Sequence, residues 1–244
     1  VYDAEINQWH LNDTSKYAFE SLSEREQGYV FEISMKLLND ILSKARRHAA
    51  ADGYRAGGLY IQPFASFKNY FDKHNILYEF SVLKNATGKL DAGNIRFDFS
   101  GIGKNIYRFS NDITLEDKNG AYVQYAMDFV AIPLLTRLQN SLFYRLNSKK
   151  KNHQIHGDGI STSNKIHCTK KGGFVSTETF SVEMLNEVKL PLYIKKVEQE
   201  NYLHLLSHPK LVSDYNLKVF DKLLKKLTTK GNIEFDFKNF EIAE

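Results

Sequence analysis

The chain has 244 residues, of which 42% are hydrophobic and 25% are charged. A chain of this length can bury a large core, and we expect a single domain over residues 1–244. The net charge of +4 is mild, and no helix-turn-helix, zinc-finger or RNP pattern accompanies it, which argues against nucleic acid as the partner. One cysteine excludes an intrachain disulfide, and no apolar run reaches the roughly 18 residues of a membrane span.

Residues 53–82 are predicted to form a strand, a glycine turn, a helix and a second strand. The first strand is expected to end at Arg55, where it passes into the loop. Pro63 suits a first helical position, because its φ is already helical and its missing N–H would be unpaired there. The helix then has an apolar face at three- and four-residue spacing, formed by Phe64, Phe67 and Phe71.

Two longer helices have clear start signals. Ser23 with Glu26 predicts a capping box that opens a helix over residues 23–47, and Ser213 caps a helix that follows it. The other expected elements are a strand at 4–9, a strand at 95–99, a hairpin around the Asn-Gly turn at 117–120, helices at 134–146 and 182–188, and strands at 190–197, 202–206 and 232–237.

The order of several motifs resembles one family. GYRAGG followed by NILYEFSV resembles the third conserved segment of the polysaccharide deacetylases (NodB homology, carbohydrate esterase family 4), in particular their bacterial surface-polysaccharide branch. EINQWHLNDT at residues 5–14, the stretch at 107–127 and SHPK at 207–210 resemble other family segments, in family order. The resemblance implies an α/β fold, a distorted β/α barrel of the NodB-homology type.

The resemblance also implies site residues. Arg55 would orient a catalytic carboxylate, and His208 would be the general acid. His10 and Asn12 occupy the metal-binding segment, and the expected cofactor is a divalent metal, Zn²⁺. From the residues alone, His10 is better interpreted as an ordinary loop histidine, and only the resemblance makes a ligand role as strong. The alternative for Arg55 is a structural salt bridge at the rim.

The chain departs from the family pattern in two places. Asn12 and Thr14 stand where relatives have a second histidine, and a carboxamide is a weak substitute for imidazole at a zinc site. The opening strand, which supplies two aspartates in the family, has no counterpart ahead of His10. Either an amino-terminal segment is missing, which we favour, or the protein is a divergent and inactive member. A polar loop contains four residues whose spacing is compatible with metal binding: His153, His156, Asp158 and His167. A loop this polar also contains histidines by chance, so these residues are equally explained without a metal.

Three hypotheses follow for function. The first is a metal-dependent hydrolase that removes acetyl groups from an N-acetylated sugar of a cell-surface polysaccharide or its precursor, as in O-antigen or capsule biosynthesis. The second is an inactive carbohydrate-binding homologue, and the third is an unrelated α/β domain. The expected partner is a carbohydrate. The expected location is the cytoplasm, or the cell envelope if a missing amino terminus carries a signal.

Overall fold

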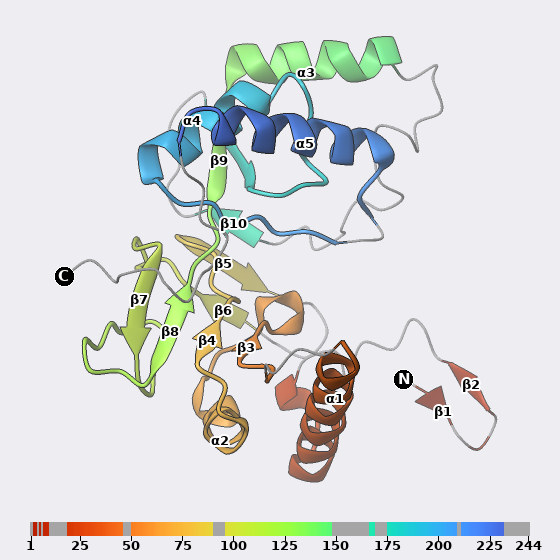
Figure 1. The fold of residues 1–244 in the computed structure, drawn as a ribbon, viewed down its shortest axis with the longest axis vertical. Coiled ribbons are helices and arrows are strands. Elements are labelled where there is room, and N and C mark those ends of the chain that lie inside the picture. The colour runs from red at the N-terminus through yellow and green to blue at the C-terminus, as the bar shows by residue number, and fades with distance from the viewer. Residues whose placement is uncertain are drawn as a thin grey trace. The chain divides into compact units, whose positions relative to one another are not determined.

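The computed structural model describes residues 2–3, 5, 7–9, 19–45, 50–89, 96–147, 166–168, 175–208 and 211–231 (Figure 1). The chain separates into two compact units, Val1–Ala126 with Lys165–His167 and Met127–Asn164 with Cys168–Glu244. Each unit has buried side chains of its own. The single domain expected over residues 1–244 stays a prediction.

The first unit contains a four-stranded sheet. Its order is β3 (Gly53–Tyr54), β4 (Tyr78–Glu79), β8 (Tyr122–Tyr125) and β7 (Ile106–Phe109). β3, β4 and β8 run parallel, and β7 pairs antiparallel with β8. The N–H of Gly120 donates to the carbonyl of Asp117 at 2.8 Å, which confirms the predicted hairpin turn. A side chain at Gly120 would collide with the Phe109 backbone, since its Cβ would lie 2.4 Å from that carbonyl oxygen.

Helix α2 (Ala65–His74) connects β3 to β4, so the predicted strand-loop-helix-strand unit is confirmed. The helix begins two residues after Pro63, not at it. The three phenylalanines of its apolar face are buried: Phe64, Phe67 and Phe71. The Phe64 ring centroid lies 4.8 Å from that of Phe109 in β7. The α2 helix therefore covers one face of the sheet.

Helix α1 (Glu24–Lys44) begins with the predicted capping box. The Ser23 N–H donates to Glu26 Oε2 at 2.9 Å, and the Glu26 N–H donates back to Ser23 Oγ at 3.4 Å. Phe31 holds the helix to the unit, because its ring stacks on Tyr54 with centroids 5.4 Å apart. The remaining elements of this unit are β1 (Tyr2–Asp3), β2 (Gln8–Trp9), η1 (Phe19–Ser21), η2 (Gly57–Leu59), β5 (Ala86–Lys89) and β6 (Arg96–Asp98), with β10 (Ile166–Cys168) pairing to β5.

In the second unit, α3, α4 and α5 gather around two antiparallel strands (Figure 1). The elements are β9 (Phe129–Pro133), α3 (Leu134–Asn147), β11 (Val175–Thr179), α4 (Leu190–Glu200) and α5 (Asp214–Thr228). The Ser213 cap of α5 is confirmed and forms a full capping box with Asn216. The core joins strand residues to the inner faces of α4 and α5: Val130, Ile132, Phe180, Leu190, Tyr193, Ile194, Val219 and Leu223.

Three local predictions in the second unit were wrong. The expected strand at 190–197 is helix α4: its buried residues Leu190, Tyr193 and Ile194 follow a helical period, and Pro191 stands in the first turn. The expected helix at 182–188 is a series of turns. The expected strand at 202–206 is reduced to one parallel bridge between Leu206 and Ser181.

The sheets formed by the described residues hold two to four strands, and none of these closes on itself. The β/α barrel therefore stays a prediction. The expected final strand at 232–237 lies outside the described residues.

Candidate functional site

The strongest candidate site begins at the parallel bridge between Ser181 and Leu206. The Leu206 N–H donates to the Phe180 carbonyl at 3.0 Å, and the Val182 N–H donates to the Leu206 carbonyl at 3.1 Å. Glu183 follows Ser181 by two residues, and His208 follows Leu206 by two. The bridge therefore brings the segment before Glu183 and the segment before His208 side by side.

Glu183 and His208 meet in a hydrogen bond. His208 Nδ1 lies 2.7 Å from Glu183 Oε1, and the side chains are 35% and 11% exposed respectively. The carboxylate accepts, so it holds the proton on Nδ1 and leaves Nε2 as the nitrogen available to a ligand. This arrangement positions a histidine for proton transfer or for binding a metal.

Contacts from α5 fix the position of the loop that carries Glu183. The Asn216 side chain donates from Nδ2 to the Leu185 carbonyl at 2.9 Å and to the Glu183 carbonyl at 3.3 Å. Tyr193 of α4 donates its hydroxyl to the Ser181 carbonyl at 3.0 Å. Buried contacts therefore hold both ends of the loop, and the carboxylate has a defined position. Glu183 Oε2 is buried and accepts no hydrogen bond within the described part of the chain.

Arg55 lies in the first unit, immediately after β3. The N–H of the next residue, Ala56, donates to Ser81 Oγ at 2.7 Å, which fastens the loop to the segment after β4. Arg55 is exposed at the carboxyl ends of the parallel strands, as the sequence predicted. His208 belongs to the second unit.

A second polar group, which the sequence reasoning missed, lies in the first unit. Glu79 is in register with Tyr54 on one side and with Gln124 on the other, so all three share a sheet face. Glu79 is fully buried, and this burial raises the pKa of its carboxyl to about 7, against opposing hydrogen bonds from Ser81. The Ser81 N–H donates to Glu79 Oε2 at 2.8 Å. Oε1 of Glu79 and Oε1 of Gln124 accept no hydrogen bond from the described residues.

The predicted metal ligands His10 and Asn12 lie outside the described residues, as do Thr14, His153, His156 and Asp158. His167 is described only as part of β10. Within the described ranges, no three histidine, cysteine, aspartate or glutamate side chains come together as a metal site. His10 and Asn12 alone would provide two donors, one fewer than catalytic zinc takes from protein. The zinc site therefore stays a prediction, and the chemistry below uses no step at a metal.

Comparison with protein-family models, with curated proteins and with solved structures finds no match. None of the helices in the described ranges is both long and apolar enough to cross a membrane.

The signal for Glu183 was present in the sequence but could not be interpreted there. FSVEML places an acidic residue just beyond a short apolar run, as many surface glutamates are placed. Only the pairing of Ser181 with Leu206, 25 residues away, shows that this glutamate faces His208.

Proposed function

We propose that this protein is a hydrolase that removes acetyl groups from an N-acetylated sugar of a cell-surface polysaccharide or its precursor. The observation that supports the proposal best is the bond between His208 Nδ1 and Glu183 Oε1. A general acid is the group that amide hydrolysis requires to expel an amine. His208 is also the residue to which the family resemblance assigns that role.

The chemistry of the step agrees with the geometry of the pair. Hydrolysis forms a bond between the acetyl carbon and a water oxygen, and it breaks the bond between that carbon and the sugar nitrogen. The departing nitrogen must gain a proton, which His208 would donate from Nε2 as the imidazolium, while the proton of the attacking water would pass to the carboxylate that activates that water. Glu183 would accept a hydrogen bond from Nδ1–H throughout, which would keep the ring oriented and stabilise the imidazolium before the transfer. Glu183 is thus proposed as a positioning residue, and His208 as the general acid.

Arg55 is proposed as a second positioning residue, which would orient the carboxylate that activates water. A guanidinium group suits this role because its planar donors match both oxygens of a carboxylate. Its place after β3 supports the proposal, since residues at the carboxyl ends of parallel strands form sites in many α/β proteins. The divalent metal, expected to be zinc, is proposed on the family resemblance alone.

A second candidate function is carbohydrate binding without catalysis. The observation that favours it is Asn12, which stands where the family has its second histidine. Loss of a metal ligand would leave a sugar site without a means to activate water.

A paired measurement separates the two candidates. The purified protein is incubated with zinc and N-acetylated chitooligosaccharides, and acetate release and sugar binding are both measured. The hydrolase predicts acetate release that His208→Ala abolishes. Sugar binding by the unaltered protein with no acetate release would reject the hydrolase and favour the binding protein. No binding and no release would reject both proposals for this class of sugar.

A further inference from the structure

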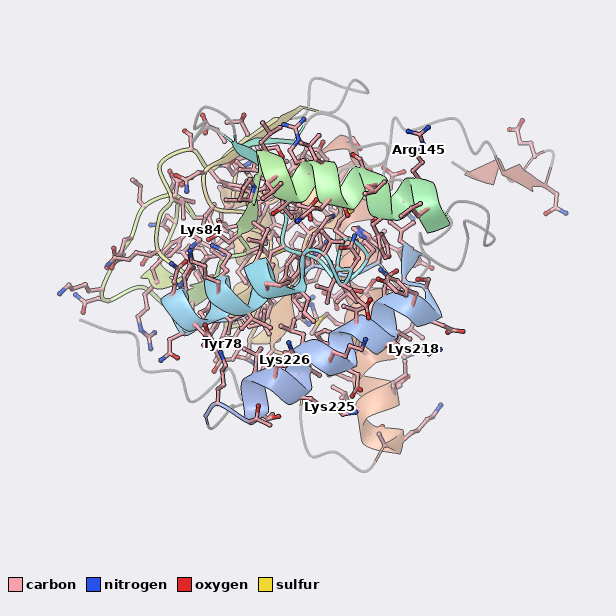
Figure 2. All side chains as sticks on the ribbon, turned by 90° about the horizontal axis from the view of Figure 1, so that it is seen from above. Tyr78, Lys84, Arg145, Lys218, Lys225 and Lys226 are labelled. Atoms are coloured by element: carbon pink, nitrogen blue, oxygen red, sulfur yellow. The ribbon has the colours of Figure 1, made fainter. Side chains whose placement is uncertain are left out.

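Glu79 is a buried carboxyl without a cation beside it. Its side chain is fully buried on the face of the four-stranded sheet that α2 covers, and Oε1 accepts no hydrogen bond from the described residues. No lysine, arginine or histidine in the described part of the chain forms an ion pair with it. Its segment lies between Tyr78 and Lys84, both labelled in Figure 2, and Lys84 Nζ donates to Asn105 Oδ1 at 2.5 Å. An ionised carboxyl in these surroundings would be a buried charge without compensation, which is costly in any fold.

The polar neighbours of Glu79 supply too few donors. Gln124, its register partner on β8, donates from Nε2 to the Tyr125 carbonyl at 3.2 Å. Gln124 Oε1 has no donor among the described residues either. Turning this amide over would set its oxygen against the Tyr125 carbonyl, acceptor against acceptor. A proton on Glu79 Oε1 would add the missing donor and remove the charge at the same time.

The titratable side chains around this face of the sheet are Tyr54 on β3, Tyr107 on β7, Tyr122 on β8, Glu20 on η1, and Lys68 and Asp72 on α2. Lys68 Nζ lies 2.7 Å from Asp72 Oδ2, so this lysine already has a carboxylate partner. Burial, and to a smaller degree the Glu79 carboxyl, raises the pKa of Tyr54 and of Tyr107. Both phenols therefore stay neutral where Glu79 titrates, and neither can compensate its charge.

Glu79 is connected through Ser81 to the loop that carries Arg55. The Ser81 N–H donates to Glu79 Oε2 at 2.8 Å, and the Ser81 hydroxyl adds a hydrogen bond to the same carboxyl. Ser81 Oγ accepts in turn from the Ala56 N–H at 2.7 Å. All three residues of this Glu79–Ser81–Ala56 link are buried. Because Arg55 directly precedes Ala56, the link reaches the backbone of Arg55.

We propose that Glu79 is a pH-dependent positioning residue, which as a neutral carboxylic acid keeps the Glu79–Ser81–Ala56 link closed and on losing its proton favours opening of the link to water. Burial raises the pKa of this carboxyl to about 7, more than the hydrogen bonds of Ser81 lower it. Desolvation therefore outweighs the attraction of those donors for the charge, and the ionised group gains most from contact with water. The inference holds whether or not the protein is the proposed hydrolase.

The first test locates the proton by carbon NMR of ¹³C-glutamate-labelled protein, with Glu79→Gln used to assign the signal. The Glu79 carboxyl should be neutral at about pH 5.5, where exposed glutamates are ionised, and should titrate with a midpoint near pH 7. A Glu79 carboxyl that is already ionised at about pH 5.5 would overturn the proposal.

The second test measures opening of the link by amide hydrogen exchange of Ala56 and Ser81. Each rate is divided into that of an unstructured peptide at the same pH, which gives a protection factor. If Glu79 titrates normally once it is open to water, protection should fall about tenfold between about pH 6 and pH 8.5. The control amide is Leu206, which donates to the Phe180 carbonyl in the second unit and should keep its protection.

Two variants complete the exchange experiment. Glu79→Gln keeps the shape of the side chain but cannot ionise, so its protection at Ala56 and Ser81 should not change with pH. Ser81→Ala removes the acceptor for Ala56 and should lower the protection of that amide at every pH. Constant protection in the unaltered protein, a fall that persists in Glu79→Gln, or an equal fall at Leu206 would each overturn the proposal.

Discussion

Each of the two units contains a histidine that is hydrogen-bonded to a glutamate. In one pair the glutamate is the more buried residue, and in the other pair it is the histidine. In the second unit Glu183 is 11% exposed and His208 is 35% exposed. In the first unit the order is reversed, with Glu32 at 45% and His74 at 14%. A contact between a histidine and a carboxylate therefore does not by itself indicate a functional histidine. Which partner is buried decides whether the imidazole can reach a ligand.

The surroundings of the two pairs explain this difference. The His74 ring stacks on Phe31 with centroids 5.8 Å apart, so the imidazole acts as packing between α2 and α1. Glu32 also accepts from Lys73, and this bond, with a smaller contribution from His74, lowers the pKa of its carboxyl. Glu183 has a buried second oxygen with no partner in the described residues, and His208 is the side chain it holds. The first pair stabilises a helix contact, and the second positions a histidine.

If the protein is the proposed hydrolase, the largest effect is expected at His208, the more exposed of the two histidines. His208→Ala should lower kcat for acetate release by about 10²- to 10⁴-fold, because general acid catalysis contributes that much. The measurement is the initial rate of acetate release from N-acetylated chitooligosaccharides. His74→Ala is the control, and it should stay within about twofold of the unaltered protein. Equal losses in both variants would mean that the two pairs do not differ in role.

Glu79 extends the comparison to a buried carboxylate that has no histidine. Its folded-state pKa of about 7 lies above the ordinary value of 4.5, so the folded protein holds this proton more tightly than the unfolded chain. The contribution of this group to the free energy of unfolding is full below about pH 4.5 and is lost as the pH rises through about 7, by about 3 kcal/mol. Glu79→Gln should remove this loss.

The measurement for Glu79 is urea unfolding of both proteins across that pH range. The difference between the two free energies of unfolding isolates Glu79 from other titrating groups. A difference that does not change with pH would show that the carboxyl titrates normally, in spite of its burial.

A smaller effect is expected from the carboxylate that positions His208. Glu183→Ala should lower kcat by about 10- to 100-fold and leave KM nearly unchanged, because it disturbs the acid and not the sugar contacts. Glu183→Gln keeps an acceptor for Nδ1 and should lose less. If Glu183 had only a structural role, its substitutions would lower the thermal midpoint, and the kcat values of the two variants would not follow this order.

The smallest effect is expected from the exposed carboxylate of the first unit. Glu32→Gln should leave acetate release unchanged and should barely move the thermal midpoint, because exposed ion pairs contribute little. The thermal midpoint is measured by circular dichroism at low and high salt. A large loss of stability would show that the pair holds α1 to α2 more strongly than its exposure implies.

The sequence predicted an element correctly where residues a few positions apart determine its structure. The capping boxes at Ser23 and Ser213 and the Asn-Gly turn at 117–120 depend on residues a few positions apart, and all three are confirmed. The segment at 190–197 was misjudged because its apolar residues were interpreted as a strand, although Leu190, Tyr193 and Ile194 have helical spacing.

The site could be predicted only in part. His208 and Arg55 stood out through their motifs, whereas Glu183 depends on a bridge between chain segments far apart in sequence. The exposed apolar side of α3 escaped prediction for a related reason; it is formed by Leu135, Leu138, Leu142 and Leu146. An amphipathic pattern shows that a helix has two faces, and only the bonds of Asn186 to Asn140 and Tyr144 show which face turns inward.

The central claim is that Glu183 holds the proton on Nδ1 of His208 and leaves Nε2 for the ligand. Nitrogen NMR of ¹⁵N-histidine-labelled protein, with His208→Ala used to assign the signal, tests it without any substrate. For the neutral imidazole, the account predicts a proton on Nδ1 that shifts toward Nε2 in Glu183→Ala. A proton already on Nε2 in the unaltered protein would contradict the account.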